Sequence, residues 1–244
     1  MEKSDILKLI VISMIGNTVY QMLFIHGINL TAASTTSLIL AMHPIFVALL
    51  SSCLKQERIH WAGWVGIFVS FIGFYFVITQ QAGSLHFSWQ SLKGDLMLLS
   101  GNMCWAIYTV FSKPILDKVS PLKLTAITLA IGTFFYLPFA ANDIAHIAWK
   151  KISWEAWASL FYSTLFAIVI SFVIWYASVK RVGNSKTSIY GNISPVFTAF
   201  FAYLFISEKI TLFQILGALI IFAGFYLTRS GYRFFERQAI NKKN

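Results

Sequence analysis

The sequence predicts an all-α membrane protein, a polytopic helical bundle of eight spans with inverted repeats. Three observations support this fold class. The 244 residues are 57% hydrophobic and only 11% charged, whereas soluble domains carry about 25% charged residues. The apolar residues fall in runs of roughly 20, the length that a helix needs to cross a bilayer. Finally, one stretch of these runs occurs twice along the chain.

Eight segments are apolar enough to span a membrane, and short polar breaks separate them. They are residues 6–25, 33–54, 61–79, 94–113, 122–141, 155–178, 186–206 and 212–229. The longest clear link, 79–95, is too short to form another domain, so we expect one membrane domain. Residues 1–8 precede an apolar stretch as a signal peptide's start would, but no convincing cleavage site follows, so we expect a retained first helix.

The basic residues are divided unevenly between the two sides of this topology. Of the 19 Lys and Arg residues, four face one side and the remaining 15 face the side that holds residue 1. Because basic residues are enriched in cytoplasmic loops, both termini are predicted to be cytoplasmic. The tail over 230–244 is basic and aromatic, which favours an interfacial anchor. No contiguous basic face with interleaved aromatics is visible, so the net charge of +10 does not indicate a nucleic-acid partner.

Residues 34–75 recur at a shift of 151 positions, with 13 of the 42 positions identical. The matches include Pro44/Pro195, Glu57/Glu208 and the glycine pairs 66/217 and 73/224, which hydrophobicity alone does not explain. In the predicted topology an odd number of spans separates each segment from its copy, so the copies are inserted upside down relative to each other. Inverted repeats about an axis in the membrane plane are typical of secondary transporters.

The same shift places the counterparts of residues 94–141 before residue 1. The sequence therefore predicts three spans of one half, within 1–79, and five spans of the other, within 94–229, a remnant of a 5+5 ten-helix carrier. The counterpart of residue 94 would lie about 57 positions before the chain begins, because the shift of 151 exceeds 94 by 57. Either the true start lies about 57 residues upstream, or the protein is genuinely shortened.

The "SPVF…SEKIT…GALIIFAGFYL" stretch, its partner "HPIF…KQERI…GIFVSFIGFYF" and "GNMCWAIYTVFSKPI" at 101–115 resemble the EamA family of the drug/metabolite transporter superfamily. The resemblance covers essentially the whole chain. It implies an N-terminal half-repeat over 1–79 that lacks two helices, and a C-terminal repeat over 94–229. It also implies a bacterial-type inner-membrane carrier that often exports amino acids or other small metabolites, and whose first two helices would help to line the central cavity.

Polar and aromatic groups at mid-span are candidates for a substrate cavity, because in hydrocarbon they must find partners or face water. Interhelical hydrogen bonding alone is the alternative for each. An aromatic-rich cavity with amide groups suits a small amphipathic solute, and the ring of His43 could titrate near neutral pH. The candidates are Asn17, Gln21, His43, Asn102, Trp105, Tyr108, Ser171, Trp175, Tyr190 and Asn192.

The prolines, the glutamates at span ends, the paired glycines and the cysteines are expected to have structural roles. Pro44 and Pro195 interrupt apolar spans and are predicted to kink them. Glu57 and Glu208 end spans, where ion pairing or helix termination is expected and coupling-ion binding is the alternative. The paired glycines are expected to permit close helix contact. The two cysteines are expected to be small buried hydrophobes.

Three function classes follow from these patterns. The leading interpretation is a secondary carrier that moves a small metabolite outward by alternating access. The alternative is a non-transporting membrane protein, either a decayed fragment or a subunit whose fold a partner completes, such as a second copy of the chain. An intramembrane enzyme is disfavoured, because HExxH, GxSxG, a P-loop and paired intramembrane carboxylates are absent from the sequence. It would regain support if His43 approached another titratable group. No cofactor or metal is expected.

Overall fold

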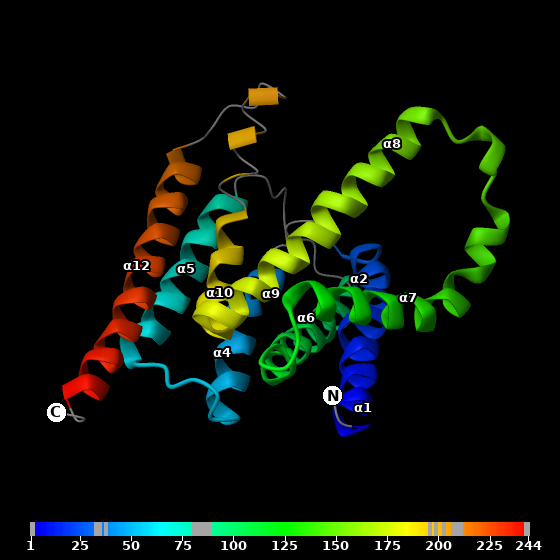
Figure 1. Ribbon diagram of the computed structural model, residues 1–244. Helices are drawn as coiled ribbons and strands as arrows, with labels where there is room; N and C mark the ends of the chain where they lie inside the picture. The colour runs from blue at the N-terminus through cyan, green and yellow to red at the C-terminus, as the bar shows by residue number, and fades with distance from the viewer. Residues whose placement is uncertain are drawn as a thin grey trace.

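The computed structural model describes residues 3–31, 36, 39–79, 89–194, 197, 200–201, 204–205 and 212–241 (Figure 1). Within these ranges the regular structure is helical and contains no strand, which confirms the all-α class. The elements in order are α1 Lys3–Ser13, η1 Met14–Val19, α2 Tyr20–Ile28, α4 His43–Cys53, α5 Trp61–Thr79, α6 Trp89–Leu116, α7 Pro121–His146, η2 Trp149–Lys151, α8 Trp154–Tyr162, η3 Ser163–Ile170, α9 Ser171–Val182, α10 Asn184–Tyr190, η4 Gly191–Ile193 and α12 Leu212–Asn241.

Several of these helices suit a bilayer. Asp5–Ile28, Pro121–His146 and Trp154–Val182 are long and apolar enough to cross a membrane, judged by length and composition. Shorter apolar helices cover Ile39–Cys53 and Trp61–Gly73, and also Ile215–Thr228. The predicted span 186–206 is described only in part, as α10 and η4.

Two of the long helices contain π-helical segments. In the first, η1 connects α1 to α2, and in the other η3 connects α8 to α9. A π-helix pairs residue i with i+5, so it widens the turn and shifts the faces of the helix on either side of it; such bulges are frequent at functional sites. Both segments lie within predicted spans, and the pattern of polar and apolar residues there does not distinguish a π-helix from an α-helix.

A buried cluster holds α1, α6, α7 and α9 together. Leu9 from α1, Leu116 from α6, Leu124 from α7 and Val179 from α9 are all at most 2% exposed. Tyr108 of α6 is fully buried among them, and its hydroxyl donates to Thr128 Oγ1 at 2.7 Å. This cluster fixes α6 centrally in the bundle, where it can present residues to several helices.

Helices α5 and α12 form a separate close pair, lying side by side in Figure 1. A Cβ added at Gly73 would lie 2.7 Å from the Gly217 carbonyl oxygen and from the Ile221 nitrogen. A Cβ added at Gly224 would lie 2.6 Å from the Gly66 carbonyl oxygen. These distances leave no room for a side chain, so the expected close contact between the glycine-bearing helices is present.

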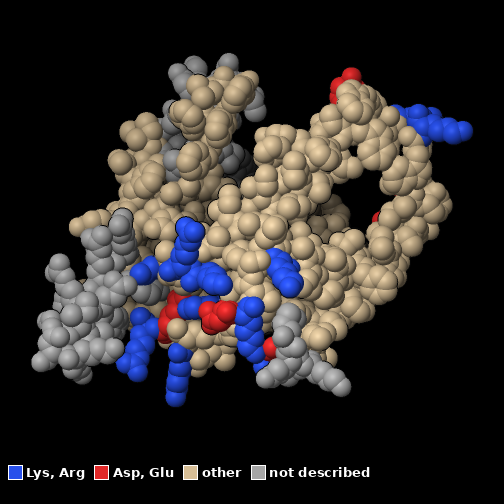
Figure 2. All heavy atoms as spheres, viewed as in Figure 1, with Lys and Arg blue, Asp and Glu red and all other residues tan. Residues whose placement is uncertain are grey.

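The charged side chains are distributed unevenly over the surface. In Figure 2 most visible Lys and Arg side chains gather along one edge of the molecule, with Asp and Glu among them. Basic residues lie in the last turn of two helices, Lys113 in α6 and Lys180 and Arg181 in α9. The helical arm of α8 and η3, in contrast, exposes apolar side chains such as Trp154 and Phe161, as expected of a surface in contact with lipid acyl chains.

Candidate functional site

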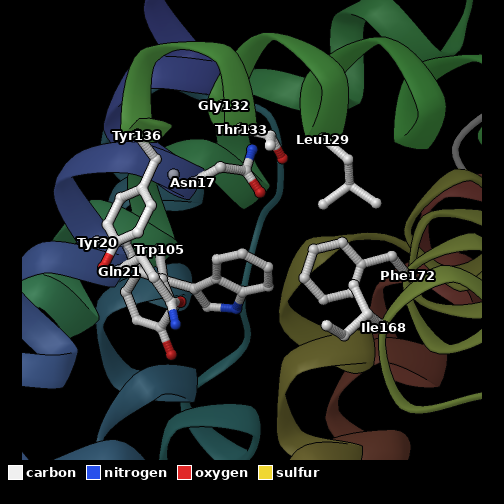
Figure 3. A pocket seen from close by; sticks show the side chains of 11 residues that line it. Asn17, Tyr20, Gln21, Trp105, Leu129, Gly132, Thr133, Tyr136, Ile168 and Phe172 are labelled. Atoms are coloured by element: carbon white, nitrogen blue, oxygen red, sulfur yellow. The ribbon is translucent and has the colours of Figure 1, made fainter. Parts of the chain in front are cut away.

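A cavity of about 350 Å³ lies between the first long helix, α6, α7 and the η3–α9 segment. Figure 3 shows its lining side chains pointing toward a common space. Of the described residues that line it, none carries a charge; they are Gly16, Asn17, Tyr20, Gln21, Trp105, Leu129, Gly132, Thr133, Tyr136, Ile168 and Phe172. Its size and its mixture of aromatic and amide groups are typical of small-molecule sites.

Both π-helical segments contribute to this cavity. Gly16 and Asn17 belong to η1, and Ile168 belongs to η3. A glycine is required at position 16, because a Cβ there would collide with the Tyr108 ring. The close approach of η1 to α6 and α7 therefore determines where Asn17 projects.

Aromatic rings form one wall of the cavity. The centroid of the Trp105 ring lies 5.2 Å from that of Tyr20 and 5.1 Å from that of Phe172, at tilted angles. The Asn17 Nδ2 group donates to the Thr128 carbonyl oxygen at 3.3 Å, which ties the amide to α7. The cavity thus combines fixed π faces with amide groups.

Three of the predicted candidates lie in this cavity: Asn17, Gln21 and Trp105. The two amides, which lie one turn apart on the first long helix, share this location. The residues of the predicted stripe, Asn102, Trp105 and Tyr108, do not share one location. Trp105 lines the cavity, and the other two do not.

Asn102 and His43 instead bind each other next to Trp175. The His43 Nδ1 and Asn102 Oδ1 atoms are 3.1 Å apart, and the Asn102 Nδ2 group donates to the Ile39 carbonyl oxygen at 2.6 Å. The Trp175 and His43 ring centroids are 5.9 Å apart. Within the described residues, His43 thus contacts an amide and an indole, and neither titrates. A titratable partner would have favoured an intramembrane enzyme.

The remaining candidates lie apart from the cavity. Ser171 is exposed and donates to the Phe166 carbonyl oxygen at 3.0 Å. Tyr190 is 51% exposed and packs on Phe225 of α12. The side chain of Asn192 and the whole of Pro195 fall outside the described residues.

Pro44 is placed differently from a mid-helix kink. Helix α4 begins at His43, and Pro44 occupies its first turn, where a missing N–H is not needed. A turn at Met42 precedes it, and the Met42 N–H donates to the Ile39 carbonyl oxygen at 3.1 Å. The proline therefore marks a break in the predicted span 33–54, and this break makes the Ile39 carbonyl available to Asn102.

Sequence reasoning missed most of the aromatic wall. Tyr20, Tyr136 and Phe172 line the cavity, but in an apolar span they are indistinguishable from residues that face lipid. A signal existed for Tyr20, which lies three residues after Asn17 and therefore on the same helical face.

The carboxylate of Glu57 is buried and links three segments of the chain at the charged end of the bundle. Glu57, in the loop between α4 and α5, accepts from Lys113 Nζ at 2.9 Å and from the Ser185 backbone N–H at 3.0 Å, and it also accepts from the Asn184 backbone N–H. Burial alone would raise the pKa of this carboxyl. The hydrogen bonds from Ser185 and Lys113, together with the Lys113 charge, outweigh burial and hold the pKa below its ordinary value.

Comparison with known proteins identifies the family. The model of the EamA-like transporter family matches residues 1–79 and 92–230. The chain belongs to the EamA-like transporter family. It is 28% identical to the uncharacterized transporter YyaM of Bacillus subtilis (strain 168), over 94% of this chain and 74% of that protein. It is 30% identical to an uncharacterized transporter of Archaeoglobus fulgidus, over 92% of this chain and 76% of that protein.

A solved structure titled "Crystal structure of protein" has the same fold as this EamA-like chain. The TM-score is 0.77 at 18% sequence identity, and the match covers 92% of this chain and 77% of that one. The EamA-like chain is thus a helical membrane transporter, and its relatives are named as transporters rather than enzymes. Among its described residues, no group of three or more His, Cys, Asp or Glu could hold a metal ion.

Proposed function

We propose that this EamA-like protein is a secondary carrier that exports a small, uncharged or zwitterionic metabolite, such as an amino acid, by alternating access. The uncharged aromatic and amide-lined cavity between its helices is the observation that carries the proposal. The membrane is a bacterial-type inner membrane, and both termini are cytoplasmic.

The chemistry of the cavity favours this substrate class. A strongly hydrated ion would leave its water for a site without a compensating charge, which is costly. A zwitterion or a polar amphipath, in contrast, can place donors and acceptors on Asn17 and Gln21 while an apolar group stacks against Trp105. The volume of about 350 Å³ suits a metabolite rather than a peptide.

The contacts between α5 and α12 support two inverted halves. At the 151-residue shift, Gly66 corresponds to 217 and Gly73 to 224. Gly73 approaches the Gly217 carbonyl, and Gly224 approaches the Gly66 carbonyl in the same way. Such reciprocal contacts are expected of a pseudo-two-fold axis between inverted repeats. The basic edge seen in Figure 2 agrees with a cytoplasmic location of that end.

Reconstitution into proteoliposomes tests the proposal. We expect counterflow, the uptake of labelled solute driven by the same solute inside, for at least one member of a pool of labelled amino acids. Trp105→Ala should reduce the rate about 2- to 10-fold, because a lost aromatic stacking partner is worth about 0.5–1.5 kcal/mol. Trp154→Ala is the matched control, since Trp154 is 79% exposed and lies outside the cavity.

Two results would contradict the carrier. Equal counterflow in both tryptophan variants would remove the cavity from the transport path. If no amino acid of the pool gives counterflow, although the protein is folded and correctly inserted, the result would favour the non-transporting interpretation, in which a partner is needed to complete the fold.

A further inference from the structure

His43 is a titratable group buried among helices, and the proposed cavity does not use it. His43 is 8% exposed, and its Nε2 atom is buried without a hydrogen-bond partner in this structure. Ionisable residues inside membrane spans are rare and mark ion or proton pathways by default. The surroundings of the ring determine which of its atoms can take a proton.

The hydrogen bonds of Asn102 assign the tautomer of the His43 ring. Because Asn102 Nδ2 donates to the Ile39 carbonyl oxygen at 2.6 Å, its other atom, Oδ1, is the one that faces His43. An amide oxygen only accepts, so the His43 Nδ1 atom, 3.1 Å away, must carry the hydrogen. The neutral ring then has a bare lone pair on Nε2.

We propose that His43 is an intramembrane proton-binding site that supplies the ion step of the transport cycle. A hydronium ion transfers its proton to the Nε2 lone pair, which leaves a water molecule and an imidazolium with both nitrogens protonated. Asn102 is the positioning residue, because it holds the ring with Nε2 free. This role rests on the proposed carrier function.

The break at Pro44 explains why this site exists. In an uninterrupted α-helix the Ile39 carbonyl would accept from the residue 43 N–H. Here it accepts from the Met42 N–H and from Asn102. The Asn102 amide is thereby oriented by backbone, and it in turn orients the histidine.

Among the described residues, the two groups that contact the His43 ring do not titrate. They are Asn102 of α6 and Trp175 of α9. The helices around His43 carry further ionisable groups, and none of these is hydrogen-bonded to its ring in the described part of the chain: Lys93, Asp95, Cys104, Tyr108 and Lys113 of α6, Tyr176, Lys180 and Arg181 of α9, Lys186 and Tyr190 of α10, and Tyr75 of α5. Lys113 is paired with Glu57 beyond the far end of α4. A proton on His43 would therefore add an uncompensated charge.

Proton binding and conformation are linked for this reason. In the described conformation a protonated Nε2 would point an N–H at no acceptor, since that atom is buried and unpartnered. The Trp175 Nε1 group beside it is also buried without a partner. A conformation that admits water to both groups would bind the proton more tightly, so protonation would shift the population toward it.

Nitrogen NMR on the protein in lipid nanodiscs tests this site. With ¹⁵N-labelled histidine, the His43 signal is assigned by its loss in His43→Gln. We expect the unusual neutral tautomer, with Nδ1 protonated and Nε2 bare, converting to the doubly protonated form only at the acidic end as the pH falls from 8 to 4, because the buried ring has no counter-charge. In Asn102→Leu the preference for protonated Nδ1 should disappear. His146→Gln, which alters an exposed histidine, should change neither property.

Two outcomes would overturn the proposal: a His43 ring that stays neutral over this pH range, or a neutral ring protonated on Nε2. If His43→Gln fails to fold, a chain with His26, His60, His86 and His146 all changed to Gln retains only the His43 signal and gives the same test. These readouts need no transport. Absent counterflow with a titrating His43 would remove the carrier and leave the proton site, whereas counterflow with a neutral His43 would remove only the proton site.

Discussion

Glu57→Gln should destabilise the protein, because it removes a carboxylate that links three segments of the chain. The carboxylate is 8% exposed and accepts from Lys113, Asn184 and Ser185, so it connects α6 and the start of α10 to the α4–α5 loop. Glutamine retains one acceptor oxygen, but its amide NH₂ group must face one of these donors.

The magnitude follows from those contacts. A hydrogen bond to a charged group contributes about 1.5–3 kcal/mol. Lys113 is 26% exposed, so water can solvate it after the change and the full penalty of an unpaired buried charge does not apply. We therefore expect a loss of about 2–3 kcal/mol. At about 2–4 °C per kcal/mol for a chain of this length, the Tm should fall by about 4–12 °C.

The pH dependence provides a second, independent readout. A group whose pKa is lower in the folded state contributes stability above its unfolded pKa, and this contribution is lost as the pH falls through the folded value. The pKa of Glu57 is lowered from an ordinary value of 4.5. The wild type should thus lose more stability than Glu57→Gln as the pH falls below about 4.5.

Thermal unfolding in detergent, followed by differential scanning fluorimetry at pH 7 and at acidic pH, measures both effects. Glu155→Gln is the matched control, because Glu155 is fully exposed at the start of α8. A Tm for Glu57→Gln within 1 °C of the control would refute the structural role of this carboxylate. A double-mutant cycle with Lys113→Met isolates the ion-pair contribution.

Two further substitutions test packing by the same assay. Gly224→Ala should cost about 1–3 kcal/mol, because its Cβ would lie 2.6 Å from backbone atoms of Gly66 and Ser70. Gly191→Ala, where a Cβ meets nothing within 4 Å, should be close to neutral, and equal Tm values for this pair would refute the α5–α12 contact. Gly183→Ala should cost about 1–2 kcal/mol, because Gly183 adopts φ +95° and its Cβ would crowd the Glu57 carboxylate. An unchanged Tm for Gly183→Ala would contradict that geometry.

Three of the expected spans, 6–25, 122–141 and 155–178, coincide with helices that are long and apolar enough to cross a membrane; they could be predicted because bilayer thickness sets a single length scale. The close contact between the glycine-bearing helices α5 and α12 was also predictable, since the seven-residue spacing puts both glycines of each helix on one face. The cavity was partly predictable: Asn17 and Gln21 are conspicuous because an amide in hydrocarbon needs a partner. Trp105 was recognised through its spacing from Asn102, although the two residues point to different neighbours.

What could not be predicted depends on contacts between distant residues. Glu57 lies next to Arg58 in the sequence, yet it pairs with Lys113, 56 positions away. Phe172 and Tyr136 resemble lipid-facing residues, and only the relative rotation of their helices turns them inward. The π-helical segment η3, which directly precedes the helix that carries Phe172, has no residue signature in an apolar run. The helix start at His43 could have been read from Pro44, which was interpreted as a kink.

Access to the cavity from both sides of the membrane is the central claim of the proposed carrier mechanism. Thr133 lines the cavity. The two native cysteines are not buried as the sequence suggested, since Cys53 is exposed and Cys104 is half-buried, so both are first replaced by serine. In that background, we expect Thr133→Cys to react with a membrane-impermeant maleimide applied from either side of sealed vesicles. Labelling from one side only, in vesicles whose orientation is established, would contradict alternating access.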